Sequence, residues 1–341
     1  MREIPSHVKI LPVSLPYMTH RMPMKQAIRR MFSKGRLDLV LYRILLSIQR
    51  YFGLEYKLWG FLPEIDGRYD VACCYNDGFV APMMIRKVNA FKKVAWIHNL
   101  YSYWPQKKYV YEALKKCDLC VPVSVEAGKD LDRVLGVSVS KYIVHNIIDA
   151  THCRRLAVEK CEIPFKHKPF RIVTVGRITA QKNVNLILPT AQLLKSANLD
   201  FEWYVIGDGD LYSDLKIQTK LLGLSSEVHF IGSRLNVMPW VKSADLIVNP
   251  SLFEAWGMTV SEALCLGKAV ITSDIPVFAE QIDNEINGLM CKATPEILSA
   301  AIIRVLTDDE LKKRIETNAS KYKFTKEYVI DEFNRMIETI T

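Results

Sequence analysis

Short apolar runs alternate with helical patterns along most of the 341 residues, and this alternation constrains the fold more than any other feature. Strands that alternate with amphipathic helices build parallel sheets out of βαβ units, so the sequence predicts an α/β fold. In the first half, the runs that predict strands are Val8–Val13, Tyr69–Tyr75, Lys93–His98, Leu119–Ser124 and Tyr142–Ile147. In the second half, they are Arg171–Val175, Glu202–Ile206, Val228–Ile231, Leu246–Asn249, Ala269–Thr272 and Leu289–Cys291.

The length of 341 residues favours two domains, because a single hydrophobic core seldom grows to that size. A basic, proline-bearing segment, Lys160–Pro169, separates the two series of strands and predicts a hinge. We therefore expect an N-terminal domain over residues 1–165 and a C-terminal domain over residues 166–325. A last helix within residues 326–341 suits packing back on the N-terminal domain, since its apolar side carries Val329, Ile330, Phe333 and Ile337.

The net charge of +9 is unevenly distributed, because residues 1–170 carry a basic excess and residues 171–341 a small acidic one. A basic domain attracts acidic partners. Its lysines and arginines are scattered among apolar helices, without an arginine-rich run or a base-stacking motif, which argues against nucleic acid. An anionic membrane surface or a phosphate-bearing acceptor fits better, and a role in solubility alone stays open.

The N-terminal sequence MREIPSHVKI lacks the basic and apolar regions of a secretory signal, so we expect a cytoplasmic protein. The longest apolar stretch, Leu37–Phe52, contains charged residues and is too short to span a bilayer. Arg36, Arg43 and Arg50 recur there at heptad spacing, which predicts an amphipathic helix. Such a helix either packs on the protein surface or lies in a membrane interface, where it would make the protein peripheral on the inner face of the membrane.

Glu254 and Glu262 stand eight positions apart in FEAWGMTVSEAL, between a predicted strand and a helix that must begin near Gly257. A glutamate pair at this spacing means little by itself, but its context is informative. The strand ends in NPS, an aromatic residue and a glutamate follow, and a glycine frees the backbone before the helix. A helix N-terminus suits a diphosphate because it offers unpaired N–H groups and partial positive charge, and the carboxylates can accept hydrogen bonds from sugar hydroxyls.

Arg177 and Lys182 follow the first strand of the second half, in VGRITAQKN, and Gly176 stands at the end of that strand. Ligands of open parallel sheets bind at the C-terminal ends of the strands, so both cations are expected at the same rim as Glu254. Two cations beside a helix N-terminus can hold a diphosphate without a metal ion and stabilise the charge that develops on a leaving group. A solvated charge for Lys182 and a capping salt bridge for Arg177 are the alternatives.

Two patterns could hold a metal ion, and neither is expected to do so. Cys117 and Cys120 form a CxxC among eight cysteines, but no second pair at zinc-finger spacing accompanies them, and the surrounding residues predict a buried strand. Asp208 and Asp210 form a DxD, which metal-dependent transferases of another fold use to hold a cation and a nucleotide diphosphate. A turn and a helix N-cap explain both aspartates, because a strand precedes them and a helical pattern, Leu211–Leu222, follows.

The segments VGRITAQKN, VIGDGDLYSDL, VHFIGSRLNV and ADLIVNPSLFEAWGMTVSEALCLGKAVITSD resemble, in this order, the retaining glycosyltransferase family 4. The resemblance covers about residues 170–310 and implies the GT-B fold, in which two Rossmann-like doubly wound domains face a central cleft. It further implies that a sugar moves, with retention of configuration, from a nucleotide-sugar donor, above all a UDP-sugar, to a saccharide or lipid-linked acceptor. Such reactions build cell-surface polysaccharides and glycolipids, and the family uses neither cofactor nor metal ion.

The same resemblance assigns roles to residues. In it, Arg177 and Lys182 bind the donor diphosphate, Glu254 contacts the donor sugar, and Glu262 contacts the ribose. The strand KKVAWIHN resembles the one that brings a histidine into the cleft, so His98 is the acceptor-side catalytic or positioning residue, with a structural histidine as the alternative. The catalytic set is thus Glu254, His98, Arg177 and Lys182, and the donor-binding set is Gly176, Arg177, Lys182, Arg234, Glu254, Gly257, Met258, Thr259 and Glu262. Gly257, Met258 and Thr259 present backbone amides, and Arg234 lies where the base is held.

The beginning of the chain departs from the family pattern. Family members open with a strand, a glycine-rich loop and a helix, and nothing before His7 supplies them, since VKILPV resembles a later strand. Either the start is truncated or the acceptor site is built without that loop. A nucleotide-sugar-binding subunit that is inactive alone is therefore one alternative function, and an epimerase on the same scaffold is another.

Overall fold

The computed structural model describes residues 64–160 and 170–340, residues 23–33, and Val8, Gly35, Val40, Leu41 and Ile44. The predicted strand Val8–Val13, the predicted helix Leu37–Phe52 and the predicted hinge Lys160–Pro169 therefore lie almost entirely outside the described residues. The chain forms two compact units: residues 1–95 with 106–117, and residues 96–105 with 118–341. The domain borders expected from the sequence stay a prediction.

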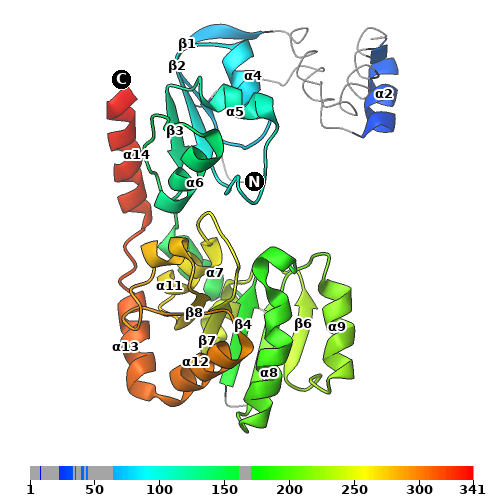
Figure 1. Ribbon diagram of the computed structural model, residues 1–341, viewed down its shortest axis with the longest axis vertical. Coiled ribbons are helices and arrows are strands. Elements are labelled where there is room, and N and C mark those ends of the chain that lie inside the picture. The colour runs from blue at the N-terminus through cyan, green and yellow to red at the C-terminus, as the bar shows by residue number, and fades with distance from the viewer. Residues whose placement is uncertain are drawn as a thin grey trace. The chain divides into compact units, whose positions relative to one another are not determined.

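The first unit is built around a parallel strand pair (Figure 1). β1 (Ile65–Cys74) pairs with β2 (Val88–Ile97), so that Cys74 stands opposite Ala95. Between them, α4 (Val80–Lys87) packs against β1 and against α5 (Lys108–Leu114), and its apolar residues are buried. The first unit also contains α2 (Met24–Phe32). Two strands predicted from the sequence, Tyr69–Tyr75 and Lys93–His98, thus fall on β1 and β2, and both real strands begin earlier.

The last residues of β2 run into the second unit, where β3 (Leu119–Pro122) completes a three-stranded sheet in the order β1-β2-β3. α6 (Val125–Leu135) follows β3, and the Ser124 side chain caps its N-terminus by accepting a hydrogen bond from the Ala127 N–H. α7 (Ala150–Ala157) begins at a similar cap, Asp149.

The prediction of a strand at Tyr142–Ile147 is wrong. This segment lies along β3, where the N–H groups of Tyr142 and Val144 donate to the carbonyl oxygens of Cys120 and Pro122. Only a single bridge, between Cys120 and Lys141, is formed. The ladder stops because its next rung needs an N–H from Pro122, and proline has none.

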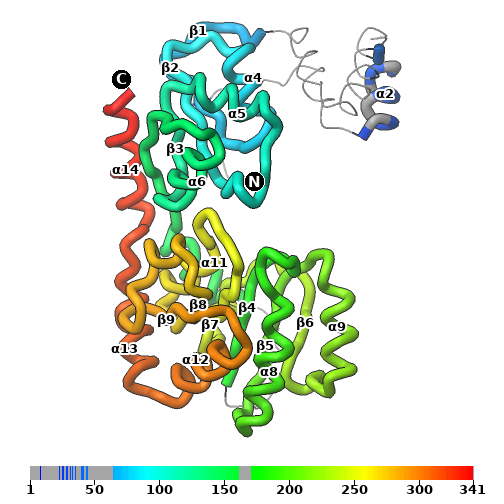
Figure 2. Tube along the Cα trace, in the orientation of Figure 1, coloured from blue at the N-terminus to red at the C-terminus, as the bar shows by residue number. Residues whose placement is uncertain are grey.

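A six-stranded sheet forms the centre of the second unit, and all of its pairs are parallel. Its order is β6-β5-β4-β7-β8-β9, so the chain runs outward from β4 to β6 and then returns to β7 on the other side (Figure 2). The neighbours β4 and β7 therefore mark the topological switch point, where ligands of doubly wound sheets bind. The strand bounds are Phe170–Val175 (β4), Phe201–Ile206 (β5), Val228–Gly232 (β6), Leu246–Asn249 (β7), Val270–Ser273 (β8) and Leu289–Cys291 (β9).

Helices cover both faces of this sheet. Ile172, Val248 and Ile271 belong to one buried cluster with residues of α8 and α12, which pack side by side. Val173, Ile247 and Val270 alternate with them, are also buried and lie outside that cluster, as expected for strands that are covered on both faces. The helices are α8 (Ile187–Ser196), α9 (Tyr212–Leu221), α10 (Met238–Ser243), α11 (Met258–Cys265), α12 (Pro295–Thr307) and α13 (Asp309–Ala319), with short 3-10 helices η2 (Ala180–Lys182), η3 (Val184–Leu186) and η4 (Pro276–Glu280).

The closing helix α14 (Lys326–Ile340) buries a different stripe from the predicted one. Ile330 and Phe333 are exposed, whereas Val329, Glu332, Met336 and Ile340 are buried. Glu332 lies within this buried stripe and forms an ion pair with His145. No helix within the described residues is long and apolar enough to cross a bilayer.

Candidate active site

The ends of β4 and β5 come unusually close at the switch point, and glycines make this possible. A Cβ atom on Gly207 would lie 1.8 Å from the carbonyl oxygen of Gly176, and one on Gly209 would lie 2.4 Å from that of Ile178. The backbone after β4 is therefore held tightly against the backbone after β5. The aliphatic part of Lys182 passes 3.5 Å from the position that a Gly176 Cβ would occupy.

Lys182 and Glu254 form an ion pair beyond the ends of β4 and β7. Only 16% of the Lys182 side chain and 10% of the Glu254 side chain are exposed. The Ser251 hydroxyl lies 2.9 Å from Glu254 Oε1 and 2.7 Å from Asn249 Oδ1. Asn249 Nδ2 in turn donates to Thr259 Oγ1 over 3.2 Å. This chain of contacts fixes the carboxylate and the first turn of α11 in one arrangement.

Gly257 starts α11 in a conformation that other residues adopt only with strain. Its φ is 89°, and an added Cβ would lie 2.6 Å from the ring of Phe278. No side chain caps this helix. The first N–H groups of a helix have no acceptor within it, so Met258 and Thr259 present backbone donors beside Glu254. Together with the helix dipole, these donors favour an anion at this position.

Aromatic residues from the segment after β2 form another wall, and they belong to the same compact unit. Tyr103 stacks on Phe253 with ring centroids 3.8 Å apart and an angle of 8° between the planes. The Arg177 guanidinium lies 6.0 Å from the centre of the Trp104 ring and donates a 2.9 Å hydrogen bond to Gln181. Gln181 Nε2 then donates to the carbonyl oxygen of Phe253 over 3.1 Å.

These groups enclose a cavity of about 220 Å³. It is lined by His98, Asn99, Leu100, Trp104, Asn146, Arg177, Gln181, Lys182, Phe253, Glu254, Ala255, Trp256, Gly257, Met258 and Thr259. The structure therefore brings together most of the site residues predicted from the sequence, including His98 from the other half of the chain. Seven of them line this one cavity: His98, Arg177, Lys182, Glu254, Gly257, Met258 and Thr259.

The remaining predicted residues, Gly176, Arg234 and Glu262, do not line the cavity. Gly176 lies behind Lys182, as described above. Arg234 is exposed at the end of β6, where it donates to the Ser233 carbonyl oxygen over 3.1 Å. Glu262 lies one turn along α11 from Met258, and burial raises the pKa of its carboxyl group to about 7.

Several lining residues were missed by the sequence reasoning. Trp104 belongs to the aromatic run NLYSYWP directly after β2, a composition that could have marked a binding loop. Asn146, Gln181 and Trp256 carried no such signal, because single residues of these types are common in any fold.

The aspartates of the DxD pattern have a local role that is only partly the predicted one. Asp208 Oδ1 accepts a 2.8 Å hydrogen bond from the Gly209 N–H, which is a turn contact. The expected helix cap is wrong, since α9 begins after Leu211 and has no side-chain cap. Among the described residues, no group of three or more His, Cys, Asp or Glu side chains is placed to hold a metal ion.

Parallel sheets with helices on both faces, and a cavity at the topological switch point of one of them, are the architecture of the GT-B fold. The complex of Anabaena Alr3699/HepE with UDP and glucose has this fold, and the likeness has a TM-score of 0.64. It covers 80% of this chain and 77% of that protein, at 17% sequence identity. The predicted fold class is thereby confirmed.

Residues 158–322, just under half of the chain, match the model of the family Glycosyl transferases group 1. It is 31% identical over 159 residues to the uncharacterized glycosyltransferase MJ1607 of Methanocaldococcus jannaschii. It is 29% identical over 150 residues to the UDP-Gal:alpha-D-GlcNAc-diphosphoundecaprenol alpha-1,3-galactosyltransferase of Escherichia coli. These matches cover 46% and 43% of this chain, and 40% and 38% of the two relatives.

Proposed function

We propose that this protein transfers a sugar from a nucleotide diphosphate donor, a UDP-sugar, to a saccharide or lipid-linked acceptor. The observation that carries the proposal is the Lys182–Glu254 pair beside the uncapped N-terminus of α11, in one cavity at the switch point. A cation and free backbone donors match a diphosphate, and a carboxylate matches sugar hydroxyls. The UDP-bound neighbour and the UDP-galactose-using relative support the choice of donor.

In this proposal, the diphosphate lies between Arg177, Lys182 and the first amides of α11. Lys182 turns from Glu254 to a phosphate oxygen, and the released carboxylate accepts hydrogen bonds from the donor sugar. Glu262 accepts hydrogen bonds from the ribose hydroxyls. The base lies between Gly176 and the end of β6, where Arg234 contacts it. His98 faces the acceptor from the other wall of the cavity.

The transfer proceeds with retention of configuration. The bond between the anomeric carbon and the departing phosphate oxygen breaks, while a bond from that carbon to the acceptor oxygen forms on the same face. The acceptor proton passes to the departing phosphate oxygen, whose negative charge Arg177 and Lys182 stabilise. No enzyme nucleophile and no metal ion take part in these steps.

The acceptor of this reaction carries negative charge. The basic excess of residues 1–170 supports an acceptor with a lipid diphosphate, and contact of that half with an anionic membrane. Sedimentation with vesicles of anionic lipid, compared with vesicles of neutral lipid, tests the membrane contact. Equal recovery with both kinds of vesicle would contradict it.

Thermal-shift titrations with UDP-, GDP- and ADP-sugars test the donor, since a ligand that binds only the folded state raises its melting temperature. We expect a UDP-sugar to give the largest shift, and mass spectrometry to detect a glycosylated acceptor. Binding without transfer to any acceptor of a broad panel would favour a non-catalytic binding subunit. Absence of binding to all three donors would defeat the proposal.

A further inference from the structure

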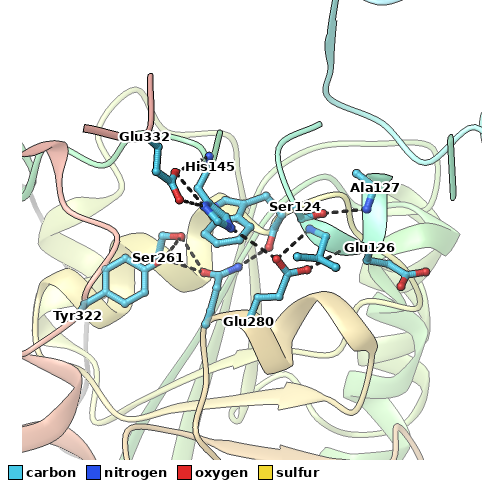
Figure 3. A network of polar contacts seen from close by, with 11 residues as sticks. Ser124, Glu126, Ala127, His145, Ser261, Glu280, Tyr322 and Glu332 are labelled. Atoms are coloured by element: carbon cyan, nitrogen blue, oxygen red, sulfur yellow. Dashed lines mark hydrogen bonds and ion pairs between the residues drawn. The ribbon is translucent and has the colours of Figure 1, made fainter. Parts of the chain in front are cut away.

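A histidine outside the cavity, His145, lies between the side chains of Glu332 and Glu280 (Figure 3). Its Nδ1 is 2.8 Å and 2.9 Å from the two carboxylate oxygens of Glu332, and its backbone N–H donates to the same carboxylate over 3.0 Å. On the other side of the ring, Nε2 lies 3.5 Å from Glu280 Oε2. Only 10% of the His145 side chain is exposed. The imidazole is therefore held between two carboxylates from separate elements, η4 and α14.

Two contacts connect His145 to the cavity. The next residue, Asn146, lines the cavity directly. The ring of Trp256, which also lines it, packs against the imidazole with centroids 4.9 Å apart. The ring of Phe324 also packs against the imidazole, with ring centroids 4.4 Å apart. Trp256 precedes Gly257, so a shift of the His145 ring acts on the start of α11 as well as on Asn146.

The charges in this cluster balance only when the imidazole is protonated. Glu280 accepts hydrogen bonds from the N–H groups of Val125 (2.9 Å) and Glu126 (3.2 Å), so the positive end of α6 compensates its charge. Both carboxylate oxygens of Glu332 contact His145 Nδ1, and the Tyr328 hydroxyl is the other titratable group against this carboxylate. A neutral imidazole would leave one of the two carboxylates facing a ring nitrogen without a proton.

The pKa of His145 agrees with this balance. Burial lowers it, but the hydrogen bonds and charges of Glu280 and Glu332 raise it by more, so it lies above the ordinary 6.5. The contribution to folding is complete below the unfolded pKa near 6.5 and is lost as the pH rises through the higher folded value. The charged form of the cluster thus persists to higher pH than in a free histidine.

We propose that His145 is a positioning residue for the proposed sugar transfer: as an imidazolium between Glu280 and Glu332, it holds Asn146 and Trp256 in the cavity wall. This inference rests on the proposed function, since it concerns the same nucleotide site. It predicts that the affinity for nucleotide changes with pH as His145 gains or loses its proton, although His145 does not touch the nucleotide.

The test is calorimetric titration of UDP against the full chain between about pH 6 and about pH 9, the range that brackets histidine ionisation. For the wild type, we expect affinity to fall as His145 loses its proton. His145→Gln keeps one hydrogen bond without the charge, so it should bind UDP about tenfold more weakly at the acid end and lose the histidine-dependent fall. The ionisation of UDP itself is common to all variants and cancels in their comparison.

Two further variants separate positioning from simple stability. His152→Gln on α7 is the matched histidine control, and its pH profile should equal that of the wild type. His145→Gln combined with Glu332→Gln replaces the charged pair by a neutral one that can still hydrogen-bond. We expect it to fold even where the single variant does not, to recover part of the affinity, and to show no histidine titration.

The outcomes distinguish this inference from the function on which it rests. A wild type that binds neither UDP nor another nucleoside diphosphate refutes both. A wild type that binds UDP, with a pH profile that survives unchanged in His145→Gln or in the double variant, refutes the positioning role alone. Nuclear magnetic resonance titration of the histidine rings gives an independent check, because a His145 pKa at or below 6.5 would also overturn it.

Discussion

The ion pair between Lys182 and Glu254 allows stability and catalysis to be separated in one set of variants. Lys182→Met removes the cation and leaves a carboxylate that is 10% exposed and accepts a hydrogen bond from the Ser251 hydroxyl. Loss of one partner of a buried pair costs about 3–5 kcal/mol, and the 16% exposure of the lysine lowers our expectation to about 2–3 kcal/mol. Glu254→Gln should cost a similar amount.

The double variant decides how the pair contributes. Because it contains no unpaired buried charge, we expect it to be within about 1 kcal/mol of the wild type in unfolding free energy. The coupling energy from the double-mutant cycle should then be about 3 kcal/mol or more. Urea unfolding followed by circular dichroism measures these values, and Arg304→Met is the control, since it breaks an exposed ion pair with Glu285 and should leave stability unchanged.

Turnover should behave differently from stability. In the proposed reaction, Lys182 holds the diphosphate and Glu254 holds the sugar, so the double variant should stay inactive although it is stable. We expect each of the three variants to lose at least about a hundredfold in turnover, which corresponds to about 2.7 kcal/mol in the barrier. Near-normal turnover in either single variant, or recovery of turnover in the double variant, would show that the pair is structural and refute the assignment.

Three other predictions concern two residues of the turn and helix at α11 and the independence of the reaction from metal ions. Gly257→Ala should lower the unfolding free energy by more than about 2 kcal/mol, because it adds a clash with Phe278 to the strain of a positive φ. The control Gly136→Ala, at φ 66° and with open space around the added methyl group, should cost about 1 kcal/mol. Equal losses of the two variants in urea unfolding would contradict this. Burial raises the pKa of Glu262 to about 7, so the native state holds its proton between pH 4.5 and about 7 and loses stability as the pH rises through that window. Glu262→Gln should therefore gain melting temperature relative to the wild type over the same window, and a constant difference would be evidence against a buried carboxyl. EDTA should leave turnover unchanged in a transfer assay, and loss of activity that Mg²⁺ or Mn²⁺ restores would overturn the metal-free mechanism.

The sheet of the second unit could be predicted almost residue by residue. Its strands are buried on both faces, so they appear in the sequence as short continuous runs of apolar residues bounded by glycine or polar turns. Leu246–Asn249 and Leu289–Cys291 match β7 and β9 at both ends. The failure at Tyr142–Ile147 has another cause, because its composition suits a strand while its neighbour Pro122 has no N–H to continue the ladder.

The candidate site was predictable where its residues share one linear motif. Glu254, Gly257, Met258 and Thr259 lie within six positions, so their geometry follows from the local turn between β7 and α11. Lys182 required one further step, the rule that parallel strands end at the same edge. Trp104 and the other residues from the first half reach the cavity through the path of the chain after β2, which no short-range pattern contains.

Glu332 shows how a site of this kind could still be found from a sequence. It occupies the buried stripe of α14, where Val329, Met336 and Ile340 are the other members, and so it interrupts an apolar pattern with a charge. An unpaired carboxylate in such a place would cost several kcal/mol, so its presence requires a cation elsewhere in the chain. Seven histidines and 46 lysines and arginines could supply that cation, and the sequence does not choose among them. His145 is chosen by its place along β3: because the N–H groups of Tyr142 and Val144 face β3, that of His145 faces the other way, and both this N–H and the ring Nδ1 contact Glu332. The following residue, Asn146, lines the cavity.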